Sequence, residues 1–171
     1  MNAAIWFGAA IFFTFGVAPT FFSPGMKALL GGTSRADAYA GLIAQMVLER
    51  YFVLNYWCGA VALAHLLAEW VYLGKAIHRW TLGILLGAFF MALCGGLWLQ
   101  PKLRDLHLIR YAEEGHYTPV EKIQAARSFS LWHGVSQVMN LAVLGGLGIY
   151  VWRITHSSDA PRFVSASKFR S

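Results

Sequence analysis

Residues 80–99 read WTLGILLGAFFMALCGGLWL and contain no charged side chain. A helix of about 20 apolar residues crosses the hydrocarbon core of a bilayer, so this stretch predicts a transmembrane helix. The rest of the chain has the same character, because 57% of its 171 residues are hydrophobic and only 13% are charged. Soluble domains carry about 25% charged residues, and the composition therefore predicts an integral membrane protein.

The N-terminal region predicts a first membrane helix. Residues 2–26 contain no acidic or basic side chain, and the apolar run within them predicts a helix over residues 3–22. No basic stretch precedes this run, which favours a retained helix over a cleaved signal peptide. The small and helix-breaking residues at 23–25 and 31–32 then predict a break in the chain.

A second helix is predicted over residues 35–73. Ser34 and Asp37 have the spacing of a capping box, with Asp in place of the usual Glu. No strong helix breaker follows before Gly74. This helix is therefore longer than the roughly 20 residues that cross a bilayer.

The third and fourth helices follow from the same signals. The third extends past residue 99 to give a helix over 80–114, with a kink expected at Pro101 because proline lacks the backbone N–H and crowds the preceding turn. The sequence TPVE at 118–121 predicts the next helix start, with Thr as N-cap, Pro at the first helical position and Glu closing the capping box. The fourth helix is expected over residues 119–153.

These lengths predict an all-α integral membrane protein with a four-transmembrane-helix bundle. The second, third and fourth helices are all longer than the bilayer is thick, and they extend beyond it on one side. We call this side, which carries residues 23–50 and 100–131, the mouth side. Residues 1–153 are expected to form a single membrane domain, and residues 154–171 a polar, basic C-terminal tail.

The basic residues favour a lipid environment over nucleic acid. The net charge is +6, and the 14 Lys and Arg residues lie mainly between the apolar stretches and in the tail, where they set topology or meet anionic lipid. We therefore expect no nucleic-acid partner. The basic short loop near Lys75 and the basic tail favour a topology with both termini in the cytoplasm.

Polar side chains at helical spacing form the main candidate site. Ser130, His133, Gln137 and Asn140 follow one another at intervals of three, four and three residues, so they lie on one stripe of the fourth helix. Asn55 and Gln100 fall at a similar depth on the second and third helices. Polar groups avoid lipid, so these side chains predict a pocket for a small polar ligand or ion near the mouth-side interface. The alternative is that they form hydrogen bonds between helices and bind nothing.

Two other groups of residues suggest weaker hypotheses. His65 and Glu69 lie four residues apart on one helical face and could relay protons. A soft metal such as Cu(I) could bind thiolate and thioether sulfur; the candidate ligands are Cys58, Cys94 and Met139.

A haem held between helices is a further alternative. His65 and His133 would have to serve as its two axial ligands. The two side chains differ in height by roughly 20 Å at 1.5 Å per residue, so one iron cannot take both. The sequence thus identifies no cofactor.

Three stretches of the chain resemble one protein family. They are FFTFGVAP at 12–19, WLQPK at 98–102 and FSLWHGVSQVMNL at 129–141. In this order they resemble the transmembrane-protein-205-like family, also called domain of unknown function 4149. The resemblance implies a small four-helix integral membrane protein with no established activity. The positions that match the family pattern are Pro19, Pro101, His133, Gly134, Ser136 and Asn140. Ser136 lies beside the polar stripe and is therefore added to the candidate ligand-binding residues.

These observations leave three classes of function open. The first is binding or transport of a small polar ligand or ion in the pocket, and transport would require a homo-oligomer. The second is a structural accessory subunit that docks on a larger membrane complex through its Gly and Ala faces. The third is the soft-metal or redox protein. No nucleophile elbow, phosphate-binding loop or zinc-protease motif is present, so the sequence does not support an enzyme.

Overall fold

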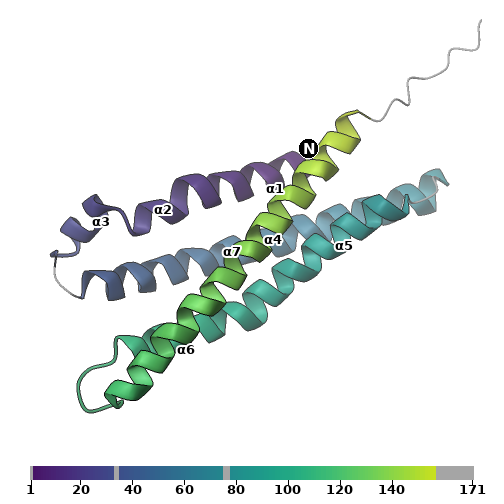
Figure 1. The fold of residues 1–171 in the computed structure, drawn as a ribbon. Coiled ribbons are helices and arrows are strands. Elements are labelled where there is room, and N and C mark those ends of the chain that lie inside the picture. Colours follow the sequence, from purple (N-terminus) through teal and green to yellow (C-terminus); the bar gives the residue numbers. More distant parts are fainter. Residues whose placement is uncertain (1, 33–34, 75–77, 157–171) are drawn as a thin grey trace, which may run out of the picture.

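The computed structural model describes residues 2–32, 35–74 and 78–156, and all regular structure in these residues is helical (Figure 1). The segments are α1 (Asn2–Ile11), η1 (Phe12–Val17), α2 (Ala18–Phe21), α3 (Pro24–Leu29), α4 (Ala36–Leu73), α5 (Arg79–Cys94), η2 (Gly95–Leu99), α6 (Gln100–Arg110) and α7 (Pro119–Thr155). The predicted cap Ser34, the loop residue Lys75 and the tail residues 157–171 lie outside the described residues.

Four of the helical runs are long and apolar enough to cross a membrane. They are Asn2–Phe21, Ala36–Tyr72, Arg79–Arg110 and Pro119–Thr155, and their most apolar windows have mean hydropathies between 1.4 and 2.1. The prediction of an all-helical, multi-pass integral membrane protein with four membrane helices is confirmed.

Two π-helical segments, η1 and η2, each lie just before a proline. The Ala18 N–H donates to the carbonyl of Phe13, and the Gln100 N–H donates to that of Gly95. These wide turns precede Pro19 and Pro101, whose rings crowd the preceding turn of a regular α-helix. The kink predicted at Pro101 therefore takes the form of a π-helical segment within a run that stays helical from Arg79 to Arg110.

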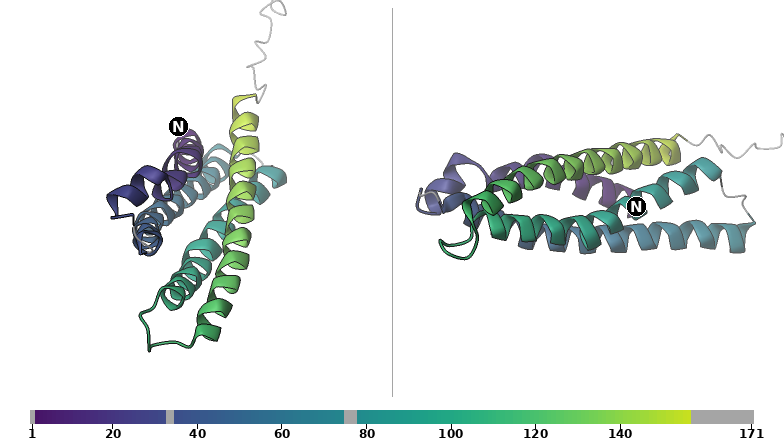
Figure 2. Two further views of the ribbon diagram at one scale, coloured as in Figure 1. Left: turned by 60° about the vertical axis from the view of Figure 1, so that its left-hand side comes forward. Right: turned by 60° about the horizontal axis from the view of Figure 1, so that its bottom comes forward.

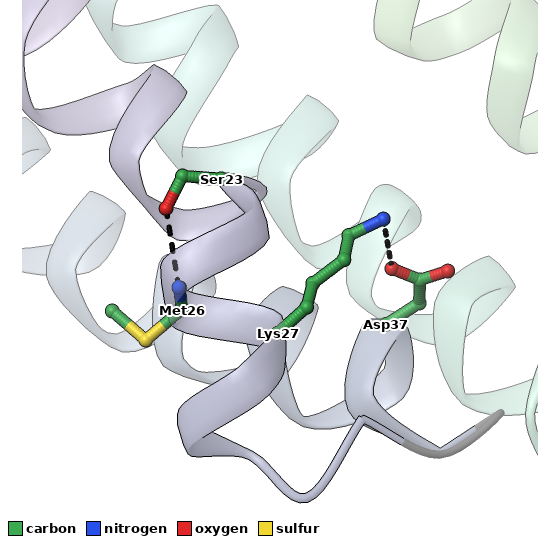
Figure 3. Close-up of polar contacts among 4 residues, drawn as sticks. All are labelled: Ser23, Met26, Lys27 and Asp37. Atoms are coloured by element: carbon green, nitrogen blue, oxygen red, sulfur yellow. Dashed lines mark hydrogen bonds and ion pairs between the residues drawn. The ribbon is translucent and has the colours of Figure 1, made fainter.

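A short helix, α3, occupies the region that the sequence predicted to be a break (Figure 3). Ser23 acts as its N-cap, with Oγ accepting a hydrogen bond of 3.2 Å from the backbone N–H of Met26, and a proline occupies the first turn. Both features favour helix starts, and the glycines nearby did not outweigh them. Lys27 Nζ lies 2.8 Å from Asp37 Oδ1, and this ion pair joins α3 to the first turn of α4.

The connection between α6 and α7 partly follows the prediction. The predicted capping box at Thr118 and Glu121 is present. The third helix ends at Arg110, however, and not at residue 114 as predicted. The ammonium group of Lys122 donates to the carbonyls of Ala112 at 2.6 Å and Glu113 at 3.5 Å. These carbonyls are thus satisfied without a further helical turn.

The four membrane helices pack together near the middle of the long helices. There α1 and α5 each contact both α4 and α7. The core cluster in this region consists of Trp6, Ala10, Cys58, Ala62, Leu85, Ala88, Val143 and Leu147. Toward the mouth side the helices separate into two groups, with α2 and α3 beside α4, and α6 beside α7 (Figures 1 and 2).

Candidate functional site

A cavity of about 690 Å³ lies between these two groups of helices. It has walls from η1 and α2, from α4, from α5 to α6, and from α7. Most of the lining side chains are apolar or aromatic, and a smaller number are polar. Sites for small molecules commonly have volumes of about 300–1,000 Å³ and this mixture of side chains.

One face of α4 forms a long wall of the cavity. Its lining residues include Asp37, Gly41, Gln45, Leu48, Phe52 and Asn55. They follow one another at intervals of four, four, three, four and three residues, and this spacing keeps all of them on one side of a helix. The cavity therefore extends along the helices from the mouth side toward the core cluster.

The structure brings six of the seven predicted ligand-binding residues to this cavity. They are Asn55, Gln100, His133, Ser136, Gln137 and Asn140. Ser130 is exposed and does not line the cavity. Phe129 takes the cavity side of α7 at this level, because its ring stacks on that of His133 with 5.6 Å between centroids and lies 5.8 Å from that of His107.

Asn55 joins α1 to α4 and is 3% exposed. Its Oδ1 accepts a hydrogen bond of 2.7 Å from Trp6 Nε1, and its Nδ2 donates one of 2.7 Å to the carbonyl of Tyr51. Both ends of the amide are thus satisfied within the protein. Asn55 therefore has the role of an interhelical hydrogen-bonding residue, which was the alternative interpretation of the polar positions.

Contacts between α4 and α6 close one side of the cavity. Gln100 Nε2 donates to Glu49 Oε1 at 3.2 Å, and Arg104 Nη1 lies 3.6 Å from the same oxygen. Nearer the mouth, His107 Nε2 forms a hydrogen bond of 3.1 Å with the carbonyl of Ala38. The imidazole lies directly against Gly41, where a Cβ atom would collide with the ring. A glycine at this position lets the two helices approach closely.

The α7 side of the cavity is more open. His133 and Gln137 are exposed, and their Nε2 atoms lie 3.1 Å apart within hydrogen-bonding distance. Deeper in the bundle, Asn140 Nδ2 donates to Thr14 Oγ1 at 2.8 Å. Thr14 belongs to η1, so this bond joins α7 to the first membrane helix across the cavity. The polar stripe of α7 therefore faces the cavity over residues 133–140.

The polar residues of the cavity wall that were missed in the sequence include Gln45, His107 and Arg110. Gln45 lies ten residues before Asn55, and the spacing along α4 was the signal that places both on one face. His107 and Arg110 belong to the amphipathic part of the third helix, which was predicted to stand outside the membrane. Their place in the wall depends on how closely α4 and α6 approach, which no local pattern reveals.

The weaker hypotheses find no further support in the geometry. His65 is exposed on α4, and no hydrogen bond joins it to Glu69 within the described residues. Cys58 packs in the core cluster, Cys94 is half-buried on α5, and Met139 lines the cavity. Across residues 2–32, 35–74 and 78–156, no group of three or more His, Cys, Asp or Glu side chains is placed to hold a metal ion. The proton relay and the soft-metal site stay predictions.

Fold and cavity define a multi-pass membrane protein whose helices enclose a mixed polar and apolar cavity. The chain belongs to the family described as domain of unknown function DUF4149, whose model matches residues 1–112. The match covers two of the three resembling stretches, including Pro19 and Pro101, and ends before the α7 stretch at 129–141. No curated protein and no solved structure matches the chain.

Proposed function

We propose that the protein binds a small ligand with a polar group in the cavity between its diverging helices. The observation that carries this proposal is the convergence of polar side chains from all four membrane helices on one cavity with largely apolar walls. Apolar walls provide contact area, and a few polar groups select and orient the ligand. The core cluster lies directly below the cavity, where all four membrane helices meet, and this favours binding over passage through a single chain.

Two glutamine side chains add amide groups to the cavity wall. Gln45 and Gln137 line the same cavity from α4 and α7.

Tryptophans at two levels suggest where the membrane lies. Near the mouth side, Trp98 and Trp132 pack edge to face with 5.2 Å between centroids, and Lys102 Nζ lies over both rings. Trp80 and Trp152 are exposed toward the other ends of the same two helices. Tryptophan is enriched at both membrane interfaces, where its polar edge meets water.

These two levels are separated by about the thickness of a bilayer core. From Trp132 to Trp152 the helix rises about 30 Å, and from Trp80 to Trp98 about 27 Å, at 1.5 Å per residue. On this placement the N-terminal part of α4, α6 and the start of α7 would extend beyond the bilayer, and this supports the proposed extension on the mouth side. The cavity then crosses the mouth-side interface, with Val143 about 16 Å below Trp132.

Native mass spectrometry of the protein extracted from its own membrane tests the proposal. The wild-type protein should carry a reproducible additional mass, and His133→Ala should reduce its occupancy about tenfold, as expected for the loss of one hydrogen bond to the ligand. Ser130→Ala is the matched control, because Ser130 lies on the same helix but outside the cavity wall. Circular dichroism of each variant checks that the helices remain folded.

The outcomes separate binding from the other functions. Equal occupancy in the His133→Ala and Ser130→Ala proteins would overturn the role of the cavity. A stable complex with another polypeptide, in place of a small additional mass, would favour the accessory-subunit alternative instead.

A further inference from the structure

The cavity is long compared with its volume. Along α4 its lining residues extend from Asp37 to Asn55, which corresponds to about 27 Å of helix. A cavity of about 690 Å³ stretched over this length is narrow. Its shape suits a chain-like ligand better than a compact one.

The two sides of this cavity differ. Contacts of Glu49, Gln100 and His107 join α4 to α6 on one side. On the other side α2 packs against α4, and within the described residues no extensive packing joins α2 to α7. Ala18 and Phe22, from α2 and its C-terminal end, line the cavity on that side. Helix packing therefore closes the cavity between α4 and α6 and leaves a lateral opening between α2 and α7.

Charge is confined to the mouth end of the cavity. Asp37 and Arg110 line it there, whereas the deeper polar residues of the wall are neutral amides and hydroxyls or His133. Asp37 is paired with Lys27 at 2.8 Å. In the described part of the chain Arg110 makes no ion pair, and its guanidinium lies over the ring of Tyr111, 5.0 Å from the centroid. Among the described residues that line the mouth end, Arg110 is thus the cation that can bind an anionic group.

We propose that the ligand is a single-chain amphiphile with an anionic head, which enters from the mouth-side leaflet between α2 and α7. Its head lies near Arg110, and its hydrocarbon chain follows the wall of α4 toward Phe52. A guanidinium pairs well with carboxylate or phosphate, and the apolar wall removes the chain from water. This inference rests on the proposed binding function and adds the chemical class and the entry route.

Three defined probes test the class of ligand, namely palmitate, hexadecanol and butyrate. They are added to the purified full-length protein in a detergent with an uncharged head, and bound probe is counted by native mass spectrometry. We expect one palmitate per chain, hexadecanol about tenfold weaker because it lacks the anionic head, and no bound butyrate because it lacks the chain. Equal binding of butyrate and palmitate would overturn the chain-like ligand.

A pair of arginine variants tests the position of the head. Arg110→Gln should lower palmitate binding about tenfold and leave hexadecanol binding unchanged, and Arg110→Lys should recover part of the loss. Arg127→Gln is the matched control, because Arg127 is an exposed mouth-side arginine outside the cavity wall. Equal losses in the Arg110→Gln and Arg127→Gln proteins would overturn the assignment of the head to Arg110.

A bulky side chain at the opening tests the entry route. Ala18→Trp should slow the uptake of palmitate from vesicles at least tenfold. Ala142→Trp, on an exposed position of α7 outside the cavity wall, should leave the rate unchanged. Equal rates in the two variants would overturn lateral entry.

The failure of this inference can be told apart from the failure of the proposed function. If palmitate does not bind, but the native additional mass is present and depends on His133, binding stands and the amphiphile is wrong. If neither the native mass nor palmitate is bound, both proposals fail.

Discussion

The two halves of the bundle use the same four membrane helices but pack them differently. In the core cluster three buried alanines, Ala10, Ala62 and Ala88, lie among larger side chains such as the fully buried Trp6 and Leu147. Small residues let helix backbones approach closely in a membrane. In the mouth half, aromatic rings stand between the helices, for example Phe13 stacked on Tyr51 with 4.1 Å between centroids.

The difference associates small residues with close helix contact. Buried alanines from α1, α4 and α5 lie where the four helices meet. Stacked rings such as those of Phe13 and Tyr51 lie where the helices separate and leave a cavity. In the mouth half, α4 and α6 also approach each other closely. Gly41 lies at this contact, where a larger side chain would collide with the ring of His107. Substitutions in the two halves test this relation, beginning with the largest expected effect.

Leu147→Ala should cause the largest loss of stability. Leu147 is 0% exposed in the core cluster, and the loss of a fully buried Leu side chain commonly costs about 2–5 kcal/mol through lost contacts and the cavity left behind. The measurement is the free energy of unfolding by denaturant, followed by circular dichroism. Leu131→Ala is the control on the same helix, because Leu131 is 65% exposed and should change stability by less than about 0.5 kcal/mol. Similar losses in both variants would contradict the assignment of the core.

Gly41→Ala should have an intermediate effect on the mouth half. The added methyl group meets the ring of His107, which is held by the carbonyl of Ala38, and overpacking of this kind costs about 1–3 kcal/mol. Gly87→Ala is the control, because nothing lies within 4 Å of its Cβ position and alanine favours a helix over glycine by up to about 1 kcal/mol. The same unfolding assay measures both. A Gly41→Ala protein as stable as wild type would show that α4 and α6 need not touch.

The hydrogen bond across the cavity should have the smallest effect. A double-mutant cycle of Asn140→Ala and Thr14→Ala should give a coupling of about 0.6 kcal/mol, the average for polar pairs between membrane helices. The coupling is obtained from the four free energies of unfolding. A value above about 2 kcal/mol would mean that this one bond, and not the size of the side chains, holds the mouth half together.

Much of the fold could be predicted from local patterns in the sequence. The four apolar stretches and the capping box at Thr118 depend only on neighbouring residues, and both are present in the structure. The helix α3 and the π-helical form of the turns before Pro19 and Pro101 were missed. In α3 a serine cap and a proline outweighed the glycines nearby, and the π-helical turns are a response of the backbone to proline that hydrophobic periodicity does not report.

Part of the candidate site could also be predicted from local patterns in the sequence. Helical periodicity places polar residues on one face of a helix, so the residues of the α7 stripe from His133 to Asn140 were identified correctly as neighbours. Periodicity does not show what that face meets. It could not show that Phe129 displaces Ser130 from the wall, or that the amide of Asn55 is already paired with Trp6.

The sequence by itself determined that the chain resides in a membrane and that most of its helices start and stop where they do, because hydrophobic length and end capping are local properties. Only the tertiary structure decided where the helices meet and where they separate, and hence that Gln45, His107 and Arg110 share a cavity with the residues of α7. The distance between two helices depends on the sizes of the side chains on both of them, and those side chains come together only when the chain folds.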